Sequence, residues 1–359
     1  MKNKKTLHLI TLLCLILGFT SCKDSGKKLM KNATGKPGSL IVVVPDKLWE
    51  SQAGKEIRSF LAQPVPSLPQ DEPMLDVINI PIEGFTDIFK TTRNILMVQV
   101  NSQIKKEQVI YSKDLWSSPQ TVVRIKASSQ EALIALFHKH EKKILSYYLS
   151  AENKILMDTY KKNTFRDKAA GNHLLEKFNI NMNFPKGFSI ALDKPNFSWI
   201  RFEARETSQG IFVWSMPYEN EDQFQVENLI AVRDSMLKTY VEGPAPKSYM
   251  ATVKDIKTLN RTFKQNNNYA VELRGLWKVE GDFMGGPWVS ISVLDVIKKR
   301  IITVDGYIYS PKYDKRNLLR QVEATLRSVS FPYQKDIDKA NKKIESIPMD
   351  ITVKPSNGK

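Results

Sequence analysis

Hydrophobic positions between residues 38 and 163 change several times between the period of a strand and the period of a helix. The unbroken apolar run at residues 40–44 predicts a strand buried on both faces. Apolar residues then recur on one stripe up to about Ala62, which predicts a helix with Asp46 as its N-cap. Further strand-like runs follow at residues 75–80, 94–100, 108–112 and 120–127. We therefore expect an N-terminal α/β domain over residues 38–163.

A long helix is the clearest element of the sequence. Ser128 and Glu131 have the spacing of a capping box, with the serine at the N-cap. Apolar residues then recur every three or four positions, and a helix carried to Lys162 would be about 50 Å long. We expect this helix to close the first domain and to lead into the second.

From residue 187 the hydrophobic period changes to two, which indicates antiparallel strands. The best alternation, at residues 269–279, places Trp277 among the apolar positions and Glu272 on the opposite face. A final helix is expected after Asp314, its candidate N-cap. We therefore predict the α+β class with two α/β domains. The second, over residues 172–333, is an antiparallel sheet covered by helices, and its order resembles the PsbP-type sandwich at the level of fold alone.

The first residues have the features of an export signal. Three lysines precede an apolar run at residues 7–19, which is shorter than the ~20 residues that a membrane-spanning helix needs. The run ends in Phe-Thr-Ser-Cys, which resembles the lipobox of bacterial lipoproteins. We expect a signal peptide over residues 1–21, a lipid on Cys22 and a tether over residues 22–37, with an uncleaved anchor or plain secretory cleavage as alternatives.

The residue after the lipidated cysteine bears on where the protein is sorted. Lys23 stands where an aspartate retains enterobacterial lipoproteins at the inner membrane, so the outer membrane is favoured. We expect the protein on the periplasmic side of that membrane rather than at the cell surface. At the other end of the chain, residues 334–359 are predicted to form a polar tail.

Composition and charge narrow the class of protein. Hydrophobic residues make up 42% and charged residues 26%, an ordinary globular balance. Only two cysteines are present, which excludes a disulfide scaffold. Removal of residues 1–21, which hold three lysines and no acid, lowers the formal charge of +16 to +13. We expect no nucleic-acid partner for an exported protein. Basic runs such as residues 298–300 suit either solvent or anionic lipid headgroups.

No motif for catalysis, metal binding or a cofactor stands out. The histidines left after processing do not have the spacing of a zinc site, and no glycine-rich nucleotide motif follows a strand. We therefore expect no catalytic residue, no metal and no cofactor. Paired carboxylates remain the open alternative, because a glycosidase needs only two acids close in space. Acids near predicted strand ends are Glu280, Asp282, Asp295 and Asp305.

The most unusual segment is residues 274–288, with four glycines and three aromatic residues between two strands. One interpretation is a long hairpin whose glycines allow a bulge. The other is a ligand site, in which Trp277, Phe283 and Trp288 form an aromatic platform for a glycan, peptide or lipid. Gly285 and Gly286 would then let the backbone approach the ligand.

Several stretches together resemble Bacteroidota lipoproteins of domain-of-unknown-function family 4837. They are residues 35–38, the stretch ending at Trp49, and residues 64–73, 89–94 and 284–288. The resemblance extends over nearly all the mature chain and implies a lipoprotein without active-site residues to carry over. We expect a non-catalytic binding or assembly module whose partner is an envelope protein, a glycan or anionic lipid. An envelope hydrolase acting on peptidoglycan or glycan is the alternative.

Overall fold

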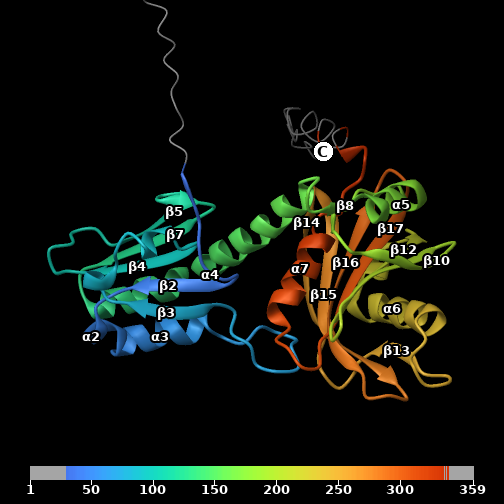
Figure 1. Cartoon of the computed structure of the whole chain (residues 1–359), viewed down its shortest axis with the longest axis horizontal. Coiled ribbons are helices and arrows are strands. Elements are labelled where there is room, and N and C mark those ends of the chain that lie inside the picture. The colour runs from blue at the N-terminus through green and yellow to red at the C-terminus, as the bar shows by residue number, and fades with distance from the viewer. Residues whose placement is uncertain (1–29, 335, 337, 339–359) are drawn as a thin grey trace, which may run out of the picture.

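The computed structural model describes residues 30–334, 336 and 338. The predicted signal peptide, Cys22, residues 22–29 of the tether and most of the polar tail lie outside the described residues. Two α/β domains stand side by side, and the long helix α4 (Gln130–Lys161) runs from one to the other (Figure 1). The predicted α+β class is confirmed. Among the described residues, no helix has both the length and the hydrophobicity that crossing a membrane requires.

The N-terminal domain is built on a five-stranded sheet with the order β3-β2-β4-β7-β5. Four of these strands run parallel, and β5 pairs antiparallel with β7 at one edge. The strands are β2 (Ser39–Val43), β3 (Asp76–Ile80), β4 (Asn94–Val100), β5 (Gln108–Lys113) and β7 (Thr121–Ala127). Smaller elements are β1 (Lys31–Asn32) paired with β6 (Ser117–Ser118), and the single-turn helices η1 (Ile82–Gly84) and η2 (Phe89–Thr91). Each strand that the hydrophobic runs predict in this domain is present.

The helix predicted from Asp46 to about Ala62 is divided in two. It forms α2 (Asp46–Trp49) and α3 (Gln52–Leu61), and Asp46 is the first helical residue rather than an N-cap. The corner between the two helices is tight, since a Cβ on Gly54 would lie 2.0 Å from the carbonyl oxygen of Trp49. Together with the first half of α4, α3 covers one face of the sheet over a continuous apolar core.

The helix α4 begins one residue later than its sequence predicts. The N-cap is Ser129, whose side chain accepts a hydrogen bond from the backbone N–H of Ala132 at 3.2 Å. The capping box predicted for Ser128 and Glu131 is therefore wrong, and Ser128 donates to Glu107 instead. With 32 residues the helix is about 48 Å long, and its second half reaches the C-terminal domain.

The C-terminal domain is an eight-stranded antiparallel sheet with the order β10-β11-β12-β17-β16-β15-β13, and β14 also pairs with β15. The strands are β10 (Ser189–Lys194), β11 (Phe197–Glu203), β12 (Ser208–Pro217), β13 (Tyr249–Thr252), β14 (Leu259–Gln265), β15 (Asn268–Glu280), β16 (Gly285–Asp295) and β17 (Arg300–Tyr309). A separate pair joins β8 (Arg166–Asp167) to β9 (Phe184–Pro185).

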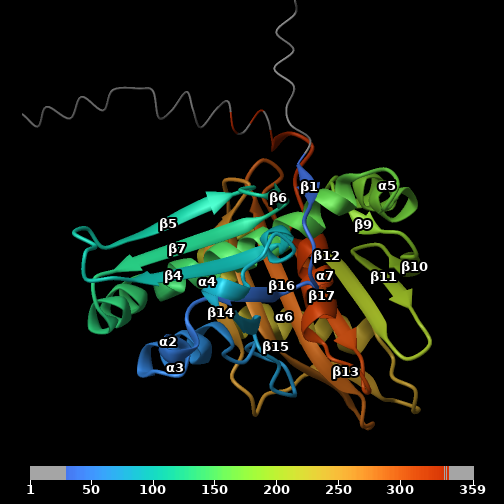
Figure 2. The same cartoon turned by 60° about the vertical axis from the view of Figure 1, so that its left-hand side comes forward.

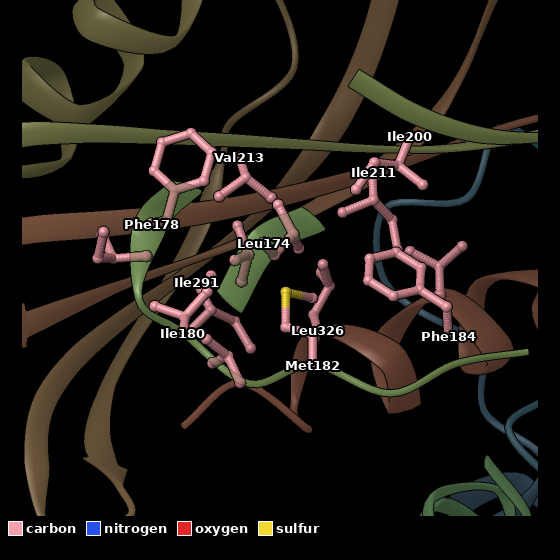
Figure 3. Packing of buried hydrophobic residues seen from close by; sticks show 14 of the residues in the cluster. Leu174, Phe178, Ile180, Met182, Phe184, Ile200, Ile211, Val213, Ile291 and Leu326 are labelled. Carbon is pink, nitrogen blue, oxygen red and sulfur yellow. The ribbon is translucent and has the colours of Figure 1, made fainter. Parts of the chain in front are cut away.

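Helices cover this sheet, as the sequence predicts, and they lie on both of its faces. On one face α5 (Lys168–Phe178) and α7 (Arg316–Leu326) cover an apolar core in which Leu174, Ile291 and Leu326 pack together (Figure 3). On the other face α6 (Val226–Tyr240), preceded by η3 (Glu221–Phe224), covers a second core rich in aromatic residues. The domain is therefore a three-layer α/β/α sandwich.

Residues 70–76 and the first turn of α7 join the two domains. Glu72 is buried, and its carboxylate oxygens accept hydrogen bonds from the backbone N–H groups of Lys315 and Arg316 at 2.6 and 2.8 Å. The guanidinium of Arg316 donates to both carboxylate oxygens of Asp76, at 2.8 and 2.7 Å. The predicted N-cap Asp314 is wrong, because a carboxylate from the other domain takes that role.

Candidate functional site

A cleft of about 760 Å³ lies between the two domains. One wall is formed by α4 and the segment between α3 and β3, and the other by β14, β15 and α7. Its volume and its position at a domain interface are typical of sites that bind small molecules. We therefore take this cleft as the candidate site.

The wall that belongs to the N-terminal domain carries most of the apolar residues that line the cleft. Leu145, Leu149 and Met157 line the cleft from three successive levels of α4. Phe60, in the last turn of α3, and Met74, in the segment before β3, extend this surface. The wall can therefore bury the apolar part of a ligand.

The wall that belongs to the C-terminal domain carries most of the charge. Seven basic and two acidic residues line the cleft as a whole. The basic residues are Lys142, Lys154, Arg261, Arg274, Arg316, Arg320 and Arg327, and the acidic residues are Glu272 and Glu323. Positive charge thus exceeds negative charge by a wide margin, which favours an anionic ligand.

Glu272 on β15 is at the centre of the charged wall. It is 1% exposed, and it accepts hydrogen bonds from Arg261 at 2.9 and 3.1 Å, from Arg274 at 2.7 Å and from Arg327. Burial by itself would raise the pKa of Glu272, but the three guanidinium groups lower it to about 2. Glu272 is therefore ionised at neutral pH and neutralises part of the arginine cluster.

Arg320 on α7 differs from the other four arginines that line the cleft because, among the described residues, it forms no salt bridge. Its guanidinium donates to the carbonyl oxygen of Met74, and among the described residues no carboxylate lies within salt-bridge distance of it. Its Nη1 is buried and makes no hydrogen bond within the described part of the chain. Burial, followed by the charge of Arg316, lowers the pKa of Arg320, and the nearby carboxylates of Glu152, Glu323 and Asp76 offset this only in part. Arg320 is thus a partly desolvated cation whose charge an anionic ligand would balance.

The aromatic platform predicted at residues 274–288 does not form. Trp277 and Trp288 are 3% and 0% exposed, and both lie in the core under α6. The indole N–H of Trp277 donates to Ile308 O at 3.1 Å, and the guanidinium of Arg233 lies 3.8 Å from the ring centre of Trp288. Of the three aromatic residues, Phe283 alone is exposed.

The two glycines of that segment allow neighbouring strands of the sheet to pack closely. Gly285 and Gly286 begin β16, and a Cβ on Gly286 would lie 2.1 Å from the carbonyl oxygen of Ile308 on β17. The close approach that glycine permits here is therefore to the neighbouring strand, not to a ligand. The hairpin interpretation of residues 274–288 describes the observed fold, with β15 and β16 joined at residues 281–284.

The acids that the sequence singled out do not converge on one site. Asp295 and Asp305 are buried and each pairs with an arginine, Arg300 at 2.8 Å and Arg233 at 2.7 Å. Glu280 pairs with Lys278 at the surface. Within the cleft, Glu272 and Glu323 meet through Arg274, which pairs with both. A glycosidase needs one carboxyl that is protonated before catalysis, and the pKa of Glu272 at about 2 does not suit that role.

Ser198, His173 and Asp193 also come together, near α5. The Nε2 atom of His173 lies 3.0 Å from Ser198 Oγ and 3.4 Å from Asp193 Oδ1, while Ser198 donates to Asp193 at 2.9 Å. In a catalytic triad the carboxylate holds Nδ1 and the serine donates to Nε2. Here the serine and the aspartate share Nε2, so the arrangement is not a triad. In the described part of the chain, no group of three His, Cys, Asp or Glu residues is placed to hold a metal ion.

The family comparisons divide the chain at the end of α4. Residues 167–328 match the family described as Domain of unknown function (DUF4837). Residues 33–161 match a second family, described as Domain of unknown function (DUF8532). The DUF4837 match is therefore confined to the C-terminal domain, and the expectation that this resemblance extends over nearly all the mature chain is corrected. The charged wall of the cleft belongs to the DUF4837 region, and its apolar wall lies largely in the DUF8532 region.

No curated protein matches the sequence. One solved structure with partial similarity is that of LpqN, described as involved in cell envelope biogenesis of Mycobacterium tuberculosis. It has 9% sequence identity to this chain and a TM-score of 0.26, over 42% of this chain and 83% of LpqN.

Sequence reasoning missed the cleft, although one signal for it was present in the DUF4837 region. Arg316, Arg320, Glu323 and Arg327 lie three or four residues apart, so a helix presents them on one face. What the sequence could not show is that this face meets Glu272 and Arg274 on β15 and the apolar side of α4.

Proposed function

We propose that this protein is a non-catalytic binding protein of the cell envelope that holds an anionic ligand in the cleft between its domains. The observation that carries the proposal is the excess of guanidinium groups along one wall, with Arg320 lacking an acidic partner among the described residues. Arginine suits such a role because its planar donors match carboxylate and phosphate oxygens. The apolar wall favours a ligand that also has an apolar part.

We propose further that the protein is anchored at the outer membrane, on the periplasmic side, by a lipid on Cys22. The support is the export signal that ends in Phe-Thr-Ser-Cys and the lysine that follows it. These features and the resemblance to Bacteroidota lipoproteins rest on the sequence alone. A phosphorylated glycolipid or an anionic lipid of the envelope would satisfy both the charge and the apolar wall of the cleft.

A pair of fluorescent probes tests the binding site. Anilinonaphthalene sulfonate and phenylnaphthylamine share an apolar ring system, but only the first carries a negative charge. We expect the purified protein to bind the sulfonate about tenfold more tightly than the neutral probe, because one charge-assisted contact is worth ~1.5–3 kcal/mol. Arg320→Gln should remove this preference, while Arg205→Gln, at an exposed position outside the cleft, should keep it. Equal binding of both probes to the unaltered protein would overturn the proposal.

The lipid anchor is tested separately. Cys22→Ala should leave the chain unprocessed or release it from the outer-membrane fraction. Unchanged processing and unchanged sedimentation with that fraction would show that Cys22 carries no anchor.

A further inference from the structure

The turn between β16 and β17 exposes two aliphatic side chains next to two lysines. Val296 and Ile297 are 62% and 56% exposed, and Lys298 and Lys299 follow them, also exposed. Tight turns ordinarily use Gly, Asn, Asp or Ser, so turn chemistry does not explain adjacent Val and Ile residues. Asp295, the last residue of β16, stabilises the turn: its carboxylate accepts hydrogen bonds from the Lys298 backbone N–H at 3.2 Å and from Arg300 Nε at 2.8 Å. The two apolar side chains are thus presented on a well-supported turn.

A second segment with the same character lies nearby. Phe165, in the turn between α4 and β8, is 53% exposed, and Lys161 and Lys162 precede it. Its carbonyl oxygen accepts a hydrogen bond from the backbone N–H of Lys186, another exposed lysine. The two segments flank α5, because Arg300 donates to the carbonyl oxygen of Phe178 at one end of that helix and Phe165 precedes its other end.

These segments lie at the end of the molecule where the described part of the chain begins, at Met30. Figures 1 and 2 show α5, the β16–β17 turn and the beginning of β1 at the same end, the upper one in both views. Eight residue steps separate Cys22 from Met30, and a fully extended chain of that length spans at most ~28 Å. A lipid on Cys22 would therefore hold this end close to the bilayer surface.

We propose that this end of the protein rests on an anionic membrane, with Val296, Ile297 and Phe165 inserted among the lipid headgroups. The lysines beside them would contact lipid phosphates, since basic residues near an anionic surface are attracted to it. This inference rests on the proposed lipid anchor, because the anchor decides which end meets the membrane. It is independent of the ligand in the cleft.

Depth-dependent quenching of a fluorescent label tests the inference. The full chain is expressed so that Cys22 is processed, and it is reconstituted into vesicles of phosphatidylethanolamine and phosphatidylglycerol. A cysteine replaces Ile297 and carries an NBD label. The matched control replaces Ile256, which is 45% exposed in the loop between β13 and β14, beside residues 274–277 of β15 and away from the β16–β17 turn.

Nitroxide-labelled lipids should quench the label at position 297 about twofold and leave the label at position 256 unchanged. Quenching at position 297 should weaken when Lys298 and Lys299 are both replaced by Gln. If the protein floats with the vesicles but the label at position 297 is not quenched, the lipid anchor is supported and the inference is overturned. The exposed turn would then be a contact site for a protein partner instead. If the protein does not float with the vesicles, the anchor itself is absent and the inference falls with it.

Discussion

Glu72 offers a direct test of how the two domains are joined. Its carboxylate caps the first turn of α7 from the other domain, through two backbone N–H groups at 2.6 and 2.8 Å. Glu72→Ala would leave both donors buried without an acceptor and would remove a negative charge from a helix N-terminus. Hydrogen bonds to charged groups contribute ~1.5–3 kcal/mol each and do not add fully, so we expect a loss of about 3 kcal/mol.

The assay is differential scanning calorimetry of the purified protein. At about 2–4 °C per kcal/mol for a domain of this size, Glu72→Ala should lower the Tm of the C-terminal domain by about 6–12 °C. Because the joint is weakened, we expect the two domains to unfold in more clearly separated transitions. Glu72→Gln should show a smaller loss, since its amide oxygen still accepts a hydrogen bond.

The control is Glu83→Ala, at an exposed position in η1. Surface changes of this kind alter stability by ~0.5 kcal/mol or less. If Glu72→Ala lowers the Tm no more than this control does, the capping role assigned to Glu72 is refuted.

Three further measurements test the packing described above. Trp288→Ala should destabilise the protein by about 3–5 kcal/mol in chemical denaturation, because the indole is fully buried, whereas Phe283→Ala at the exposed turn should change stability little; the reverse order would contradict the core assignment. Arg233→Met should cost about 3–5 kcal/mol because it leaves the buried Asp305 unpaired, and a cost below 1 kcal/mol would contradict the importance of that pair. The pKa of Glu272 is lowered from 4.5 to about 2, so its ionisation contributes about 3 kcal/mol of stability that is present above pH 4.5 and is lost as the pH falls toward 2. Glu272→Gln should flatten this dependence of the unfolding free energy on pH. An unchanged slope in the variant would refute the stabilising role of the ionised carboxylate.

Secondary structure was largely predictable because it depends on local patterns. The apolar run at residues 40–44 and the alternation at residues 269–279 formed strands where they were expected, and the long helix ends within one residue of its predicted end. Cap assignments were less accurate. Ser128 and Asp314 both lie next to a helix start, but hydrogen-bond geometry selected Ser129 for α4 and Glu72 for α7.

The candidate site was not predictable, for a related reason. The sequence drew attention to Trp277 and Trp288 because aromatic and glycine residues are concentrated there, yet burial under α6 makes them core residues. The cleft instead depends on residues that are far apart in the sequence and unremarkable one by one. Arg320 is one of many basic residues, and it differs from the rest through the surroundings that burial gives it.

The sequence by itself determined the alternation of strands and helices and the α+β class, because both depend on residues close together in the chain. The tertiary structure decided which acid caps α7, which tryptophans are buried and which arginines face a cleft. Glu72 and Lys315 are separated by 243 residues, and only the packing of two domains brings them into contact. Whether a side chain is buried or meets an opposite charge depends on which residues pack around it in space. A pattern along the chain cannot specify those neighbours.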